Sequence, residues 1–410
     1  MLVLFPLIIF FSFLGFLTGI LTGLLPGLHV NNIALILLSL SGMLVSFFSF
    51  LNRYGVSSDI ILLMICIFIV TNAISHSFHD FLPSSFLGAP DEDTALSVLP
   101  AHSLLLEGRG FEAIVYSALG SYGAILFCFL LLFPVRFIIG EPLFFYDTLR
   151  EIMFFVFILS GVFGFLIFDL SVDSPIGLSS PVLFPALAGL FGTPTLLKSV
   201  LTKPCIPHQK TCEPVFDWKT RRSSILSIVT GGLGGILVSI IPGITSATGT
   251  ILAMTARGES DKRQTITTIS AVNTACAFFV IVMMFVILKP RSGAAIAAME
   301  LISVSEWRGF LLPSSLIYLL IAILIAGNLS YFSFLKIGKF FAEKFDKIPY
   351  FPLVKATILL VVVLVFLFTG FIGLLVLFVA TGIGLLPVEW GVRRSHCMGV
   401  LLVPIIYYFH

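Results

Sequence analysis

The sequence predicts an all-α polytopic integral membrane protein made of two inverted structural repeats, with helices broken at Pro-Gly pairs. The first observation is composition: the 410 residues are 58% hydrophobic and 11% charged, with a mean hydropathy of +1.12. A soluble core cannot hide so large an apolar surface. The second is a Pro-Gly pair inside an apolar run in each half of the chain. The third is a set of landmarks that recurs around both pairs.

Long apolar stretches predict the spanning segments. A helix needs about 20 apolar residues, at ~1.5 Å rise, to cross a hydrocarbon layer of ~30 Å. On that measure we expect about 10–12 membrane segments. The first, residues 1–19, lacks a basic start and a small-residue cleavage site. We therefore expect it to be retained, in a multi-pass protein of the cytoplasmic membrane.

The Pro-Gly breaks predict re-entrant or discontinuous helices. In lipid, the unpaired backbone groups of a broken helix cost several kcal/mol each unless protein or a water-filled cavity satisfies them. A helix that starts after the break also directs N–H groups and its positive dipole end at a bound anion. The alternative is a plain kink satisfied by Ser and Thr. The two breaks supply these expected substrate-binding residues: Pro26, Gly27, His29, Asn31, Asn32, Pro242, Gly243, Thr245, Ser246 and Thr248.

Landmarks in the same order predict a duplicated unit. Aligning the two breaks also pairs Asn72 with Asn273, Pro90 with Pro290, and Arg109-Gly110-Phe111 with Arg308-Gly309-Phe310. We therefore expect a first repeat over residues 1–197, a linker over 198–222 and a second repeat over 223–410. Residues 244–256 are too short to span, since a helix of that length covers only about 20 Å, and we expect half of a re-entrant hairpin there.

Basic loops predict the orientation. The second half has three basic segments, Lys198–Arg222, Arg257–Arg263 and Lys336–Lys355, which we place in the cytoplasm. The corresponding first-half loops are poor in basic residues: 51–58 has only Arg53, and 136–150 sets two arginines against Glu141 and Asp147. Opposite bias in equivalent loops indicates opposite sides of the membrane, hence inverted repeats. Drift toward a more basic second half is the alternative.

Polar residues outside the breaks supply further candidates. Asn72 and Asn273 lie in apolar helices, where an amide either joins helices or binds substrate. Asp91 and Asp93 are candidates for a coupling Na⁺ or H⁺, and Arg291 is a candidate anion clamp, provided that their segments face a cavity and not bulk water.

Enzyme, metal and nucleic-acid functions find little support. The chain has no H-E-x-x-H, no G-x-S-x-G and no C-x-x-C motif, and it has no basic run with interleaved aromatic residues. We expect no catalysis, no cofactor, no bound metal and no nucleic-acid partner.

Four stretches carry a family resemblance: GLLPGLHVNN, GAPDEDTALSVLPAHSLLLEGRG, SPVLFPALAGLFG and SIIPGITSATGT. Over nearly the whole chain they resemble the membrane permease of the tripartite tricarboxylate transporters, the TctA-like family, in its stand-alone archaeal-type form. The resemblance implies secondary transport of an organic anion driven by Na⁺ or H⁺ through alternating access. It also implies a small membrane subunit and an extracytoplasmic binding protein as partners, besides the lipid bilayer.

A second resemblance keeps an alternative open. PGITSATGT is similar to the PG-x-SGGT element of the bacterial polyprenyl-phosphate translocases, which implies a lipid phosphate as cargo. The sequence leaves the choice between a soluble anion and a lipid phosphate open, and likewise whether the protein forms a homo-oligomer.

Overall fold

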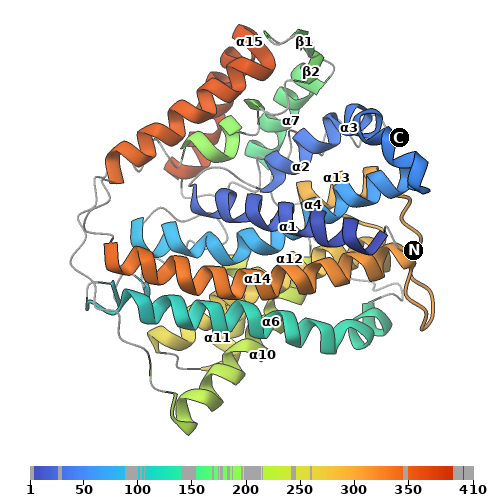
Figure 1. Ribbon diagram of the computed structural model, residues 1–410. Coiled ribbons are helices and arrows are strands. Elements are labelled where there is room, and N and C mark those ends of the chain that lie inside the picture. The colour runs from blue at the N-terminus through green and yellow to red at the C-terminus, as the bar shows by residue number, and fades with distance from the viewer. Residues whose placement is uncertain are drawn as a thin grey trace. The chain divides into compact units, whose positions relative to one another are not determined.

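The computed structural model is helical and has the features of a multi-pass membrane protein (Figure 1). It describes residues 4–25, 30–87, 100–101, 104–105, 107–139, 154–168, 170–173, 175, 179–181, 185–186, 188–194, 197, 214, 216–241, 246–258, 261–344, 350–390 and 400. Within these residues, 7 helices are long and apolar enough to cross a membrane, or up to 8 when a bent pair is counted as one span. The predicted helical, multi-pass membrane fold is confirmed, whereas the two inverted repeats and the figure of about 10–12 segments for the whole chain stay predictions.

The described elements follow one another in this order: α1 (Leu4–Leu24), α2 (Val30–Ser39), α3 (Ser41–Phe47), η1 (Phe48–Tyr54), α4 (Ser58–His79), η2 (Pro83–Leu87), α6 (Gly110–Ile139), α7 (Phe154–Phe168), β1 (Ser171–Asp173), β2 (Ser179–Pro181), η4 (Ala188–Gly192), α10 (Trp218–Ile240), α11 (Ser246–Arg257), α12 (Lys262–Val286), α13 (Gly293–Leu301), α14 (Ser314–Lys344) and α15 (Tyr350–Trp390).

The helices form two compact units. The first unit contains residues 1–25, 40–143 and 204–348, and the second contains 26–39, 144–203 and 349–410. Each unit therefore combines segments from both predicted repeats. The repeat boundaries describe sequence and not compactness, so they stay a prediction.

The first unit is built around α4 and α12. These are the most buried of its spanning helices: 78% of the apolar stretch of α4 and 89% of that of α12 are buried. Asp217 and Asp261 cap α10 and α12 by accepting the backbone N–H of Thr220 and Gln264, each at 2.8 Å. Such caps satisfy N–H groups that the first turn leaves without partners, which fixes where these two helices begin.

Three helices of the first unit run in one direction. Along α1, Gly15 lies against Phe68 and Gly23 against His79, so α1 and α4 are parallel. Phe78 of α4 packs on Phe334 of α14, and Phe86, just beyond α4, packs on Phe341. The helices α1, α4 and α14 are therefore parallel to one another.

Three other helices run in the opposite direction. Glu112 and Ser117 of α6 contact Arg263 and Ser270 of α12, so these two helices are parallel. Gly231 and Gly235 of α10 follow α12 in the same sense, along Thr268 and Val272.

Contacts between the two sets give their relative sense. Tyr122 of α6 donates to Asn328 of α14 at 2.9 Å, whereas Ile114 contacts Gly338, so α6 and α14 are antiparallel. Ser77 meets Thr274 at 3.2 Å and Asp80 meets Asn273 at 2.9 Å, and this crossing joins α4 to α12.

Two seams with closely packed glycines have matching contacts. In the α1–α4 seam, Gly15 faces Phe68 O and Thr71, and Gly19 faces Asn72 O and Ser75. In the α10–α12 seam, Gly231 faces Thr268 O and Ala271, and Gly235 faces Val272 O and Ala275. By these contacts Asn72 corresponds to Val272. The sequence alignment of Asn72 with Asn273 is therefore one residue out of register with the packing.

The helix after the second break turns back along α10. Gly249 of α11 packs on Gly234 of α10, and Arg257 reaches Ser227 nearer the start of α10. Figure 1 shows the two helices next to each other. The 12 residues of α11 rise only about 18 Å. A short helix after the break is thus confirmed, while its re-entrant placement in a membrane stays a prediction.

The second unit packs α2, α7, η4 and α15 around apolar side chains. Its core includes Leu35 of α2, Phe163 of α7, Leu190 of η4 and Val376 of α15. The long helix α15 is interrupted at Gly370, whose φ of 62° suits glycine. The sequence analysis did not predict the short antiparallel hairpin of β1 and β2 in this unit.

Candidate functional site

The breaks themselves are only partly described. Pro26, Gly27, His29, Pro242, Gly243 and Thr245 lie outside the described residues, as do Asp91 and Asp93 and the side chain of Thr248. The flanking helices are described: α1 ends at Leu24 and α2 begins at Val30, while α10 ends at Ile240 and α11 begins at Ser246. The roles assigned to the undescribed residues remain proposals.

The predicted polar residues on the helices after the breaks lie in different units. Ser246 is buried at the start of α11 in the first unit, and its carbonyl accepts the Thr250 hydroxyl at 2.8 Å. Asn31 and Asn32 lie in α2, in the second unit, where Asn32 is buried. The polar residues after the first break and those after the second therefore belong to separate units, and each group is considered within its own unit.

A buried polar cluster lies at the C-terminal end of α4, beside the end of α1. We call the following residues the α4 polar cluster: Asn72, Ser75, His76, Ser77, His79 and Asp80. Three of its contacts join α4 to α1: Asn72 Nδ2 donates to Thr18 Oγ1 at 2.9 Å, Ser75 Oγ donates to the Phe16 carbonyl at 2.9 Å, and His76 Nδ1 lies 3.1 Å from Thr22 Oγ1.

Histidine His79 connects the cluster to α14. Because a carbonyl only accepts, His79 Nδ1 donates to Ser75 O at 2.7 Å, and its Nε2 lies 3.0 Å from Ser333 Oγ. Both ring nitrogens are thus engaged in a fully buried position. These contacts fix the ring orientation.

The two predicted asparagines are buried but do different things. Asn72 joins α4 to α1 through its bond to Thr18, and joining helices is one of the two roles that the sequence allows for it. Its Oδ1 has no partner in the described part of the chain. Asn273 donates its Nδ2 to Asp80 Oδ2 at 2.9 Å. This buried amide–carboxylate pair lies where α4 and α12 cross, next to the contact of Gly23 with His79 and Asp80.

Sequence reasoning did not select Asp80 as a site residue, although it is a 5% exposed carboxylate. The available signal was its position: His76, His79 and Asp80 close an otherwise apolar helix. An ionisable residue inside a spanning segment is by default a functional candidate.

Arg291 lies next to the second break. It is half-buried and donates to the carbonyl of Val238, in the last turn of α10. The neighbouring Lys289 is exposed. Arg291 is therefore held against the last turn of α10, and its role as an anion clamp stays a prediction.

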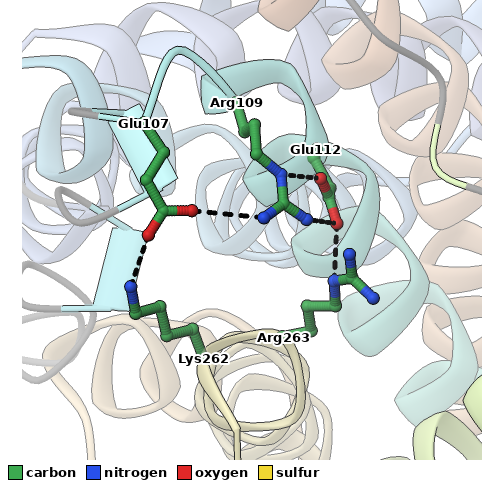
Figure 2. Close-up of polar contacts among 5 residues, drawn as sticks. All are labelled: Glu107, Arg109, Glu112, Lys262 and Arg263. Carbon is green, nitrogen blue, oxygen red and sulfur yellow. Dashed lines mark hydrogen bonds and ion pairs between the residues drawn. The ribbon is translucent and has the colours of Figure 1, made fainter.

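A charged network joins the start of α6 to the start of α12 (Figure 2). Lys262 Nζ lies 2.6 Å from Glu107, and Arg109 contacts both Glu107 and Glu112, the latter at 2.7 Å. Arg263 Nε lies 2.6 Å from Glu112 Oε1, which also accepts from Arg109 Nη2 at 2.8 Å. The hydrogen bond from Lys262 lowers the pKa of the Glu107 carboxyl, and the hydrogen bond to Glu112 raises the pKa of Arg109.

Comparison with known proteins identifies relatives along nearly the whole chain. Residues 9–168 and 148–399 match the family described as "Tripartite tricarboxylate transporter TctA family". The chain is also similar to an uncharacterized protein of Methanocaldococcus jannaschii, with 29% identity over 419 residues and 97% of each chain covered. No solved structure matches.

Proposed function

Because the chain belongs to the tripartite tricarboxylate transporter TctA family, we propose that it carries an organic anion of the tricarboxylate or carboxylate class, coupled to Na⁺ or H⁺ by alternating access. The family resemblance is confirmed, and with it a membrane transporter permease that is not an enzyme. The substrate, the coupling ion and the transport cycle are the proposed part.

One observation carries the proposal: the buried Asp80–Asn273 pair joins α4 to α12 in the first unit, beside the end of α1. A carboxylate buried in a spanning segment costs a few kcal/mol on insertion scales and is usually retained for ion or substrate movement. In this proposal Asp80 binds the coupling cation, with Asn273 orienting its carboxylate. The predicted candidates Asp91 and Asp93 remain alternatives for the same role.

We propose that the first unit binds the substrate at the second break, by the end of α10 and the start of α11. The helix that starts after a break directs N–H groups at an anion, and Arg291 adds a positive charge next to the second break.

Inverted repeats are proposed on the basis of helix direction. By their positions relative to the breaks, α1, α4 and α6 correspond to α10, α12 and α14. Contacts support opposite directions for α4 and α12, and for α6 and α14. Opposite directions of equivalent helices are what an inverted repeat requires.

The same directions support the proposed orientation. Helices α6, α10 and α12 begin, and α14 ends, at one end of the first unit, where Glu112 meets Arg263 and Ile114 meets Gly338. The basic segments Lys198–Arg222, Arg257–Arg263 and Lys336–Lys355 all adjoin these helix ends. We propose that this end faces the cytoplasm.

A small membrane subunit and an extracytoplasmic binding protein are proposed as partners, as the family description suggests.

Uptake into proteoliposomes tests the proposal. Purified protein is reconstituted and offered radiolabelled citrate under an imposed Na⁺ or H⁺ gradient, with labelled polyprenyl phosphate in a parallel assay. We expect citrate-class anions to accumulate under one gradient and to leak out when it is dissipated. Movement of polyprenyl phosphate without uptake of any carboxylate would overturn the proposal in favour of a lipid-phosphate translocase.

A further inference from the structure

Arg257 has a guanidinium edge that no residue of the described chain uses. It is the last residue of α11, and its Nη1 donates to Ser227 Oγ on α10 at 2.8 Å and to Thr268 Oγ1 on α12 at 2.7 Å. Its Nε and Nη2 are buried and have no hydrogen-bond partner among the described residues. Arg257 therefore bridges α10 and α12 with three of its five N–H donors unused among the described residues.

The two hydroxyls hold the arginine without neutralising it. Ser227 and Thr268 donate their own protons to the carbonyls of Ser223 and Gln264, at 2.9 and 2.8 Å, so each accepts from Arg257. Arg257 belongs to none of the ion pairs found in the described part of the chain, whereas the nearby Arg263 is paired with Glu112. Arg257 is partly buried, with Nε and Nη2 covered, and a positive group that loses its water is normally paired because desolvation is costly.

The unused edge has a defined chemistry. Nε and Nη2 form the side of a guanidinium that binds two oxygens of a carboxylate or phosphate in parallel. The third nitrogen, Nη1, is already anchored, which holds the fork in a fixed plane. A lysine ammonium or the N-terminus of a helix does not present such a planar pair of N–H donors.

We propose that Arg257, anchored by Ser227 and Thr268, binds an oxyanion, the carboxylate or phosphate group of a ligand, at the basic end of the α10–α11 pair. This site is distinct from the breaks, since the 12 residues of α11 put it about 18 Å along the helix from Ser246. The edge is covered in this conformation, so the ligand enters when the arginine rotates or α11 moves. The site does not depend on transport, since binding is measured directly.

Two sources supply this chemistry, and the experiment separates them. The full-length protein, Arg257→Gln and Arg257→Lys are purified, with Arg221→Gln as the control because Arg221 is an exposed arginine on α10 at the same end. Binding of radiolabelled citrate and of inorganic phosphate is measured in detergent. Thermal unfolding is compared in nanodiscs of phosphatidylglycerol and of phosphatidylcholine.

For a soluble ligand, we expect Arg257→Gln to weaken citrate or phosphate binding by about tenfold or more, and Arg257→Lys by several-fold because the fork is lost. Arg221→Gln should change binding less than about twofold. For a lipid ligand, binding of soluble anions is unchanged, and the extra stability in phosphatidylglycerol disappears in Arg257→Gln alone. The proposal is overturned if Arg257→Gln equals Arg221→Gln in every assay, or if the wild-type protein responds to none of the three probes.

Discussion

The α1–α4 and α10–α12 seams have matching backbone contacts but different side-chain chemistry. In both, two glycines bring one helix against a carbonyl of the other. At matching positions α4 has Thr71, Ser75 and Asp80, whereas α12 has Ala271, Ala275 and Val280. The first seam is joined by hydrogen bonds such as Ser75 to Phe16, whereas the second is lined by small apolar side chains.

This difference separates structure from function. Close helix contact in a membrane needs small residues and van der Waals packing, which the second seam achieves at these three positions with apolar side chains alone. The polar groups of the first seam are therefore not required for packing of this kind. Buried His and Asp side chains carry an insertion cost that apolar residues avoid. We infer that the α4 polar cluster is retained for ion or substrate movement.

The largest expected effect is at Asp80, the position where the first seam has a charged side chain and the second has Val280. Asp80→Asn preserves shape and removes the charge, so we expect gradient-driven accumulation to fall by about a hundredfold or more while the protein stays folded. The matched change Val280→Ala in α12 should cost about 1–3 kcal/mol of stability and leave transport within a few-fold. Both are measured by proteoliposome uptake and thermal unfolding. Normal accumulation by Asp80→Asn would show that the first seam differs only in structure.

Glycine substitutions test what the seams share. An added Cβ at Gly235 would lie 2.5 Å from Ala275 Cβ and 2.7 Å from the Val272 carbonyl oxygen, and at Gly19 it would lie 2.7 Å from the Asn72 carbonyl oxygen. We expect Gly235→Ala and Gly19→Ala each to lower stability by about 1–3 kcal/mol through overpacking. Gly42→Ala is the control, because nothing lies within 4 Å of its added Cβ.

The two glycine variants should differ in function. Gly19→Ala pushes on the helix that holds the α4 polar cluster, so transport should fall further than its lost stability explains. Gly235→Ala should transport at a rate set by the amount of folded protein. Equal loss of transport per folded molecule in the two variants would contradict the functional difference between the seams.

A smaller effect is expected at Arg291, beside the end of the second seam. If the substrate anion meets Arg291 away from water, Arg291→Ala should weaken apparent affinity by more than about thirtyfold, because a buried charge-assisted pair is worth about 2–5 kcal/mol. A solvated steering charge gives less than about fivefold. Arg291→Lys should still be impaired if a bidentate contact is lost. Lys289→Ala, an exposed neighbour, should behave as wild type.

The sequence alone predicted the parts of this fold that depend on local pattern. The helix ends beside Pro26 and Pro242, the short α11 and the burial of Asn72 and Asn273 follow from apolar runs interrupted by Pro-Gly or by single polar residues. These features need no knowledge of which helices touch.

Features that depend on helix contacts were not predictable in the same way. Asp80 and Asn273 are 193 residues apart, and their hydrogen bond exists only because α4 and α12 cross in opposite directions. The sequence alignment of Asn72 with Asn273 is one residue out of register with the helix contacts, since spacing along the chain does not reveal which carbonyl each glycine faces. The partners of Arg257 also come from two different helices.

The smallest expected effect concerns Glu107, at the end of the first unit where α6 and α12 begin. Lys262 and Arg109 lower the pKa of its carboxyl below the ordinary 4.5. A lowered folded-state pKa means that the contribution to stability is fully present above pH 4.5 and is lost as the pH falls through the folded-state pKa. Because the group is exposed, Glu107→Gln should lower the thermal midpoint only slightly at neutral pH and low salt. The difference should vanish near 1 M salt, where the screening length is about 3 Å. Glu306→Gln breaks the exposed pair with Arg308 and is the matched control. A large loss of stability at neutral pH that persists in high salt would contradict this assignment and make Glu107 a structural anchor between α6 and α12.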